Sequence, residues 1–283
     1  MSRLIINADD FGLTSGVNRA IVELHQARVL TSTTLMARAG ATSEAIRMAL
    51  ETPSLGVGCH VVLVDGQPVL PPGDIPSLVD RQTGCFPPSL TTFLRRLSTG
   101  RIRAAEIEAE AAAQIALLQA AGLRLTHIDT HKHTHMFPPV LDPLLRAARK
   151  AGIRAVRNPF EPEWAVRATP RASLVRTAEV FALRRFGPFF RRMIARAGVA
   201  TTDGTVAVAA TGTFDADTVR ALLGELPEGT WELVTHPGYN DADLDKVRTR
   251  LRDSRDKERL ALAAVGEFSS IDLISYAELH SPI

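Results

Sequence analysis

The segment Thr126–His135 holds four of the eight histidines of this 283-residue chain, together with the carboxylate of Asp129. Neutral imidazole is the commonest nitrogen ligand of zinc and similar ions, so this grouping indicates a metal site. A surface run of histidines, or histidines bonded within a core, would give the same composition. One segment also cannot complete a site, so further ligands must come from elsewhere in the chain.

Apolar and polar residues alternate from Leu123 to Ile128, which predicts a short strand leading into the histidines. Because side chains on a strand point alternately to its two faces, His127, Asp129 and His131 would share one face. The Phe-Pro-Pro at 137–139 stops the strand and begins a helix. Junctions of this kind between a strand and a helix commonly hold the active sites of α/β proteins.

Three other predicted strands end in, or carry, chemically capable side chains: Asp9 and Asp10 after the first strand, His60 within the third, and His236 after the strand 231–235. In a parallel sheet or barrel, the carboxyl ends of all strands open on one face, so these residues can meet there. One carboxylate and two imidazoles describe a catalytic metal site, and a second carboxylate can act as a base towards water.

Each of these features has a purely structural alternative. An aspartate pair at a strand end is more often a turn or a helix cap, and a histidine inside an apolar strand is more often a satisfied core residue. The coincidence at four strand ends favours the functional interpretation.

The elements that must position these residues alternate regularly between strands and helices, which predicts a parallel sheet with helical crossovers. We expect strands near 4–8, 32–36, 55–64, 123–131, 153–157, 206–209, 231–235 and 271–275, and helices near 17–28, 43–50, 103–121, 139–151, 215–224 and 244–264. Residues 65–100 are rich in Pro and Gly and predict a long loop, the kind of segment that often forms a lid. We expect one domain over residues 1–283.

The segment 164–200 carries eight arginines at 167, 171, 176, 184, 185, 191, 192 and 196 against the single acid Glu179, with apolar residues at helical spacing. A basic amphipathic helix pair can lie on an anionic membrane or bind an acidic partner, whereas two surface helices with solvated arginines give the same pattern. The formal net charge of the whole chain is only +2, which does not indicate a nucleic-acid partner.

Two cysteines, Cys59 and Cys85, give neither a disulfide framework nor a zinc-ribbon spacing. The first residues lack the basic region and long apolar run of a signal peptide, and no apolar run approaches the roughly 18 residues of a membrane span. These features predict a cytoplasmic protein.

The chain resembles the YdjC-like carbohydrate deacetylases in four segments: Asn7–Leu13, Gly58–His60, His127–His135 and Thr235–Pro237. The segments follow in the family's order and spacing over most of the chain. The resemblance implies an irregular (β/α) barrel related to the polysaccharide deacetylases. It also implies hydrolytic removal of acetyl groups from N-acetylated sugars with one divalent metal ion, zinc or magnesium.

The resemblance further implies a role for each matching residue: metal ligands Asp10, His60 and His131, general base Asp9, and general acid His236. Arg157 would orient Asp9 or bind substrate. His127 and Asp129 would support the site from behind, whereas His133 and His135 would contact substrate or shape the loop.

Finer features are similar to the hopanoid-biosynthesis-associated (HpnK-like) branch: the stretch His60–Pro71, Lys132 within the histidine run, and Arg157–Pro162. That branch is associated with deacetylation of N-acetylglucosaminyl hopanoid, a lipid-linked amino sugar. Many members that act on sugar oligomers have His in place of Lys132. The basic segment would then contact the inner face of the cytoplasmic membrane.

Several alternatives stay open at this point. The substrate could be a soluble N-acetylglucosamine oligosaccharide such as chitobiose. Two histidines and one carboxylate also serve non-haem iron oxygenases, although the neighbouring Asp9 and His236 favour hydrolysis. A sugar- or lipid-binding module with a structural metal is the non-enzymatic alternative. The oligomeric state is open, with a homodimer as one option.

Overall fold

One curled parallel sheet organises the chain. The computed structural model describes residues 2–170, 172–265 and 271–279. Six strands follow in the spatial order β4-β3-β2-β1-β6-β5, and β7 joins the edge of β1 beside β2. The strands are β1 Ser2–Phe11, β2 Ser32–Leu35, β3 Gly56–Val61, β4 Ile128–Thr130, β5 Gly204–Val206, β6 Gly229–Thr235 and β7 Asp272–Leu273.

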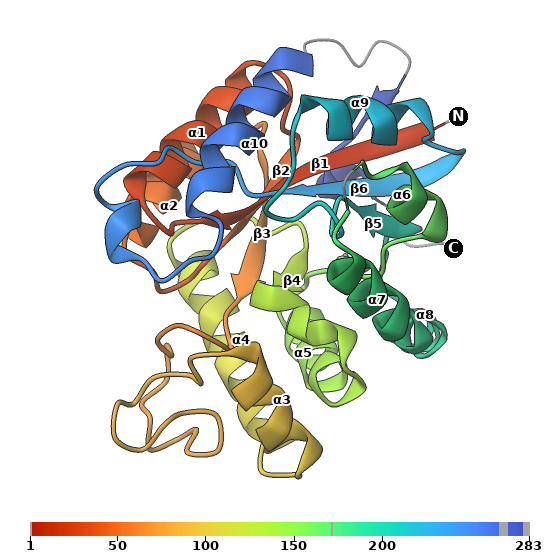
Figure 1. Ribbon diagram of the computed structural model, residues 1–283. Helices are drawn as coiled ribbons and strands as arrows, with labels where there is room; N and C mark the ends of the chain where they lie inside the picture. The colour runs from red at the N-terminus through yellow and green to blue at the C-terminus, as the bar shows by residue number, and fades with distance from the viewer. Residues whose placement is uncertain (1, 171, 266–270, 280–283) are drawn as a thin grey trace.

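Helices connect the strands and cover the outer surface of the sheet (Figure 1). The α-helices are α1 Ser15–Gln26, α2 Thr42–Glu51, α3 Leu90–Ser98, α4 Ala104–Ala120, α5 Pro138–Lys150, α6 Glu163–Ala168, α7 Leu174–Leu183, α8 Gly187–Ala197, α9 Ala216–Gly224 and α10 Arg252–Val265. Short 3₁₀ segments are η1 His131–Met136, η2 Arg184–Phe186, η3 Leu244–Lys246 and η4 Tyr276–Glu278.

The sheet curls because isolated bridges continue it past β4. Ile128 pairs in parallel with Val156, and Ala155 pairs with Ala200, a few residues before β5. β5 in turn pairs with β6, so the strand path returns to β1. All strand pairings among the described residues are parallel, as helical crossovers require. The predicted irregular (β/α) barrel is confirmed.

The central strand β1 is buried on both faces from Leu4 to Phe11, as expected for a parallel strand covered by helices. Its first helix, α1, is capped by Thr14, whose hydroxyl accepts a hydrogen bond from the backbone N–H of Val17. The helix therefore begins two residues before the expected start at 17. The cap fixes where the chain leaves the carboxyl end of β1.

The expected loop at 65–100 is shorter than predicted. Leu90–Ser98 forms helix α3, and Ser89 caps it by accepting a hydrogen bond from the backbone N–H of Thr92. Leu90, Phe93, Leu94 and Leu97 recur at helical spacing. The helix was missed because the prolines and glycines of 65–100 led to the whole segment being predicted as a loop. The segment between β3 and α3 has no regular helix or strand and projects beside α3 and α4 (Figure 1).

The expected strands at 123–131 and 206–209 are also displaced. β4 ends at Thr130, so His131 is the first residue of η1 and not the last of the strand. β5 ends at Val206, and Ala207 has a left-handed φ of 73° that ends the extended conformation. Both strands stop where the chain turns over the carboxyl end of the barrel.

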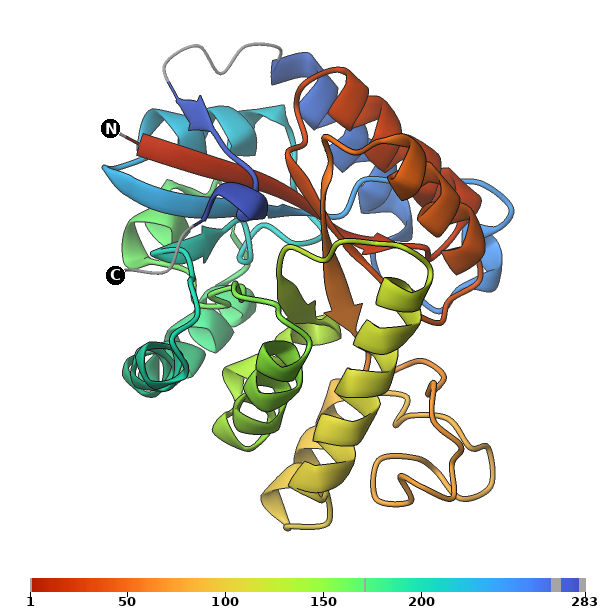
Figure 2. The same ribbon diagram turned by 180° about the vertical axis from the view of Figure 1, so that it is seen from behind.

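The basic segment forms α6, α7, η2 and α8, while Arg171 lies outside the described residues. Seen from behind (Figure 2), α8 and α7 lie beside α5, on the side of the molecule away from the loop after β3. Within the described ranges, no helix has both the length and the apolar character that a membrane span requires.

Candidate active site

The carboxyl end of β1 presents two successive carboxylates to the same site. Neighbouring side chains on a regular strand point to opposite faces. Here the pairing of β1 with β2 shifts register between Ala8 and Phe11, and Asp10 has a left-handed φ of 67°. This bulge turns the chain so that Asp9 and Asp10 are both buried in the site. Asp tolerates the left-handed region better than most residues do.

Asp10, His60 and His131 come together at this end of the barrel. Asp10 Oδ1 lies 3.5 Å from His60 Nε2 and 3.2 Å from His131 Nδ1. The two imidazole nitrogens are 3.3 Å apart. Donor atoms around a tetrahedral zinc ion, at about 2.1 Å from it, lie about 3.4 Å from one another. The three atoms therefore have the spacing of one face of a metal coordination shell.

The chemistry of this donor set also fits a cation. Asp10 Oδ1 is buried and has no hydrogen-bond donor among the described residues, which is a costly arrangement unless a cation satisfies it. Burial would raise the pKa of Asp10, but Arg255 and His131 outweigh it and hold that pKa well below its usual range. Asp10 is thus an ionised ligand, and these residues can hold a divalent metal ion.

The balance of charges around the site also favours a bound cation. Five described carboxylates are buried there, from Asp9, Asp10, Asp129, Glu232 and Glu258, against the two buried guanidinium groups of Arg157 and Arg255. The excess of three negative charges equals the charge of one divalent cation plus one protonated histidine. Burying uncompensated charge is expensive, so the fold favours a cation at this position.

Asp129 and Thr34 fix the orientation of His60 from behind. Asp129 Oδ1 lies 2.7 Å from His60 Nδ1, and the Thr34 hydroxyl lies 3.1 Å from the same nitrogen. His60 Nε2 is thereby directed at Asp10, the arrangement that a metal-ligating histidine commonly has. Burial lowers the pKa of His60, but the Asp129 carboxylate raises it more strongly, to about 9. The field at this ring therefore favours positive charge.

Arg157 holds Asp9 from the floor of the site. Its side chain is fully buried, and its Nη1 and Nη2 donate to the two oxygens of Asp9 at 2.9 and 2.6 Å. The same guanidinium forms ion pairs with Asp129 and Glu232. Burial opposes ionisation of Asp9, but Arg157 dominates and keeps the pKa of Asp9 well below its usual range. Of the two roles predicted for Arg157, this geometry fits orientation of Asp9.

His236 lies on the opposite side of Asp9. Its Nε2 is 3.8 Å from Asp9 Oδ2, and its Nδ1 is 3.7 Å from Glu258 Oε2. Glu258 also accepts a hydrogen bond from the backbone N–H of His236 at 2.6 Å. Burial acts to lower the pKa of His236, but the Glu258 carboxylate and Asp9 raise it overall. His236 therefore retains a proton more readily than a free imidazole.

Comparisons with known proteins identify the family of this chain. A family model described as YdjC-like protein matches residues 3–266. The chain belongs to the YdjC-like family. A carbohydrate deacetylase of Thermoanaerobacter pseudethanolicus is 30% identical over 87% of this chain and 85% of its own length. One from Geobacillus stearothermophilus is 35% identical over 85% of this chain and 81% of its own length.

A solved structure from Enterococcus faecalis V583, of a protein named provisionally for cellobiose-phosphate cleavage, has the same fold. It superimposes with a TM-score of 0.75, at 27% identity, over 97% of each chain. The match to a carbohydrate deacetylase of Brevibacillus brevis is 44% identical but spans only 56% of this chain and 60% of that protein.

The remaining histidines of the run in this YdjC-like protein have different surroundings. His127 is fully buried and stacks on Tyr276 at 3.8 Å between ring centroids. His135 is also fully buried, bonded to the Thr130 hydroxyl at 2.7 Å and near the Arg157 carbonyl at 3.2 Å. Neither is accessible to a substrate. His133 is partly exposed and remains placed for a substrate contact.

Burial lowers the pKa of His127 to about 3 and that of His135 to about 4, so both rings are neutral at physiological pH. His127, Asp129 and His131, which were predicted to share one face of a strand, lie at three different places in the structure. His127 lies at the base, Asp129 lies behind His60, and His131 lies at the site.

Lys132 connects the histidine segment to the loop after β3. Its Nζ donates to Asp65 Oδ2 at 2.8 Å, and both side chains are partly exposed. Lys132 and His133 both have left-handed φ values, of 58° and 51°, which turn the chain sharply after His131. The pair lies at the rim and not among the metal-ligand candidates.

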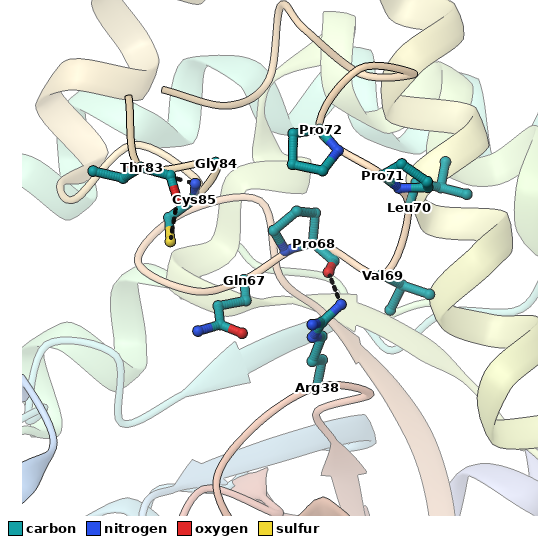
Figure 3. A pocket seen from close by; sticks show the side chains of 10 residues that line it. All are labelled: Arg38, Gln67, Pro68, Val69, Leu70, Pro71, Pro72, Thr83, Gly84 and Cys85. Carbon is teal, nitrogen blue, oxygen red and sulfur yellow. Dashed lines mark hydrogen bonds between the residues drawn. The ribbon is translucent and has the colours of Figure 1, made fainter. Parts of the chain in front are cut away.

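A pocket lies between Arg38, three residues after β2, and this loop (Figure 3). Arg38 forms one wall and donates from Nη1 to the Pro68 carbonyl at 2.8 Å. The other walls are Gln67, Pro68, Val69, Leu70, Pro71, Pro72, Thr83, Gly84 and Cys85. The lining thus combines three proline rings with the polar side chains of Arg38, Gln67 and Thr83.

Five residues of the site were not predicted from sequence: Thr34, Glu232, Arg255, Glu258 and Tyr276. Arg255 Nη2 donates to Asp10 Oδ2 at 2.5 Å, and the Tyr276 hydroxyl donates to Glu232 Oε2 at 2.5 Å. Glu232 could have been found from the sequence, since it is the single charged residue of strand β6 and lies between Trp231 and Leu233. Arg255 and Glu258 offered none, because they occur in a highly charged helix where solvent exposure is the ordinary expectation.

Proposed function

We propose that this chain is a metal-dependent hydrolase that removes the acetyl group from an N-acetylated amino sugar. The observation that carries this proposal is the cluster of donor atoms from Asp10, His60 and His131, all within 4.8 Å of one another, beside Asp9 and His236. The curated relatives named carbohydrate deacetylase support the same chemistry. Zinc and magnesium are the candidate ions.

A divalent cation held by Asp10, His60 and His131 would supply Lewis acidity, which polarises the acetyl carbonyl and raises the acidity of water. Asp9 acts as the general base. Arg157 holds it ionised and in a fixed orientation, so it can accept the proton of the water that attacks the carbonyl carbon. The base needs no other residue to deprotonate it.

His236 acts as the general acid. The carbon–nitrogen bond breaks when the leaving nitrogen takes a proton, and the products are acetate and the free amino sugar. Glu258 and Asp9 keep that proton on His236. His236 is therefore protonated because the Glu258 carboxylate lies beside it, and Asp9 is ionised because the Arg157 guanidinium lies beside it.

For the substrate, we propose N-acetylglucosaminyl hopanoid, a lipid-linked sugar reached from the inner face of the cytoplasmic membrane. Lys132 and the exposed basic helices support this choice. A soluble chitooligosaccharide is equally well supported, since a relative from Serratia marcescens, 38% identical over 52% of this chain, is named chitooligosaccharide deacetylase.

The test is release of free acetate from chitobiose and from acetylglucosaminyl lipid, each with and without a chelator. Acetate release that stops with chelator and returns with added metal supports the proposal. Binding of either substrate without acetate release would contradict it and favour a non-enzymatic module. The ratio of the two rates selects between the lipid-linked and the soluble substrate.

A base variant tests the assignment of Asp9. We expect Asp9→Asn to lower the rate by about 10²–10⁴-fold because general base catalysis is lost, while the bound metal measured by elemental analysis stays near that of the unmodified protein. His131→Ala should lose both metal and activity. The exposed Asp243→Asn serves as the control. A metal-replete, folded Asp9→Asn protein with normal turnover would refute the assignment.

A further inference from the structure

Helices α7 and α8 carry most of the exposed large apolar side chains of the described residues. Six such side chains are exposed in all, and four lie here: Leu174 (87% exposed), Val175 (70%), Phe181 (44%) and Phe189 (45%). Leu174 and Phe181 are seven residues apart, so they lie on the same face of α7. Val180 is the only buried residue of that helix. The apolar face of α7 therefore points outward.

The same two helices also carry a large excess of positive charge. Six arginines lie between Leu174 and Ala197, at positions 176, 184, 185, 191, 192 and 196, against the single acid Glu179. Arg176 pairs with Glu179 at 3.3 Å and Arg184 with Glu163 at 3.7 Å. The other four arginines have no carboxylate partner in the described part of the chain. The surface thus combines exposed apolar groups with uncompensated cations.

We propose that this face of α7 and α8 is a docking surface for an anionic phospholipid bilayer. Exposed apolar side chains rimmed by arginine suit the boundary between headgroups and acyl chains. A second copy of this chain fits less well. A symmetric contact would place the same positive surface against itself, and the like charges would repel.

The docking surface is attached directly to the active-site segments. Phe137, which ends the histidine run, packs edge-to-face on Phe186 at 5.8 Å between ring centroids. Phe160, three residues after Arg157, packs on Phe190 at 5.6 Å. Both views place α7 and α8 next to α5, whose first turn follows the histidines (Figures 1 and 2). A headgroup in the bilayer would lie close to the site, so the inference rests on the lipid-linked substrate proposed above.

Vesicle co-sedimentation of the full chain tests the proposal. The probes are vesicles of phosphatidylcholine alone and of an equal mixture of phosphatidylcholine and phosphatidylglycerol. We expect binding to the anionic vesicles only, and weaker binding as salt is raised, because salt screens exposed charges. Equal binding to both kinds of vesicle, or binding to neither, would overturn the proposal.

Two pairs of substitutions locate the surface. Arg185→Ser with Arg192→Ser should weaken binding about fivefold for each arginine removed, a factor that corresponds to about 1 kcal/mol each. Leu174→Ser with Phe181→Ser should also weaken vesicle binding, because two exposed apolar side chains are removed. The controls are Arg47→Ser with Arg220→Ser, and Leu50→Ser with Leu260→Ser, exposed residues on α2, α9 and α10.

Acetate release from soluble chitobiose, measured on every variant, separates the two proposals. Variants that lose vesicle binding but keep this activity support the docking surface. Activity on chitobiose without vesicle binding by the unmodified chain would refute the docking surface and leave the deacetylase proposal standing. Sedimentation velocity tests whether a second copy of the chain occupies this face instead. A dimer of the unmodified chain that becomes a monomer in the Leu174→Ser, Phe181→Ser variant would assign the face to that second copy.

Discussion

At the residue scale, the site depends on which partners the two oxygens of each carboxylate have. Asp10 gives Oδ2 to Arg255, and its Oδ1 faces His60 and His131. Asp9 gives both oxygens to Arg157 and lies beside His236. These two adjacent residues are thus suited to the different roles proposed for them, because Asp10 has an oxygen that faces both imidazoles and Asp9 is oriented by a guanidinium.

Arg255 is therefore expected to orient Asp10 for metal binding. Arg255→Met removes the hydrogen bond with little change of volume, and we predict that it weakens metal binding about 10-fold, the low end for partners of metal ligands. Arg255→Lys should restore part of the affinity because it keeps the charge. Calorimetric titration of the metal-free protein with zinc measures both.

Arg252→Met, an exposed change on the same helix, is the control. The guanidinium also repels a cation, so removing it has an opposing effect. Tighter zinc binding by Arg255→Met would show that this repulsion outweighs orientation and would refute the prediction.

At the element scale, close packing of strands makes the base of the site. Gly58 in β3 lies against the ring of His127, and a Cβ on Gly58 would come within 2.6 Å of two ring atoms. His127 cannot move away freely, because Tyr276 stacks on its other face. A glycine is thus required at this strand position so that β3 and β4 can carry His60 and Asp129 side by side.

Gly58→Ala should consequently destabilise the fold by about 1–3 kcal/mol, the usual cost of forcing an extra carbon into a packed core. Denaturant unfolding followed by circular dichroism measures it. Gly224→Ala is the matched control, since nothing lies within 4 Å of the added carbon there. Equal stability of the two variants would mean that the base of the site is loosely packed.

Sequence patterns predicted several elements well, and β1, α1 and α4 lie within a few residues of the expected positions. β1 contains a continuous apolar run, α1 has apolar residues at helical spacing, and Gly122 marks the end of α4. The turn of η1 was not predictable, since Lys132 and His133 have left-handed conformations that their residue types do not signal. Arg255 was also missed, because only the folded structure shows that its side chain is buried and bonded to Asp10.

At the scale of the whole molecule, the candidate metal ligands link three distant parts of the chain. Asp10 lies near the end of β1, His60 lies in β3, and His131 begins η1. Without a cation, the buried carboxylates around them keep an excess of negative charge that opposes folding. Metal binding should therefore stabilise the entire barrel, and stability becomes a measure of the site that does not depend on activity.

The last prediction follows from this linkage. At a free metal concentration of 100 times Kd, a ligand that binds only the folded state adds about 2.7 kcal/mol, and this raises Tm by about 5–10 °C for a chain of this size. Differential scanning calorimetry with zinc, with magnesium and with chelator measures the shift for each ion. His131→Ala should unfold at the same temperature with and without metal, because one ligand is lost. A metal-induced rise that persists in His131→Ala would place the stabilising ion elsewhere in the molecule.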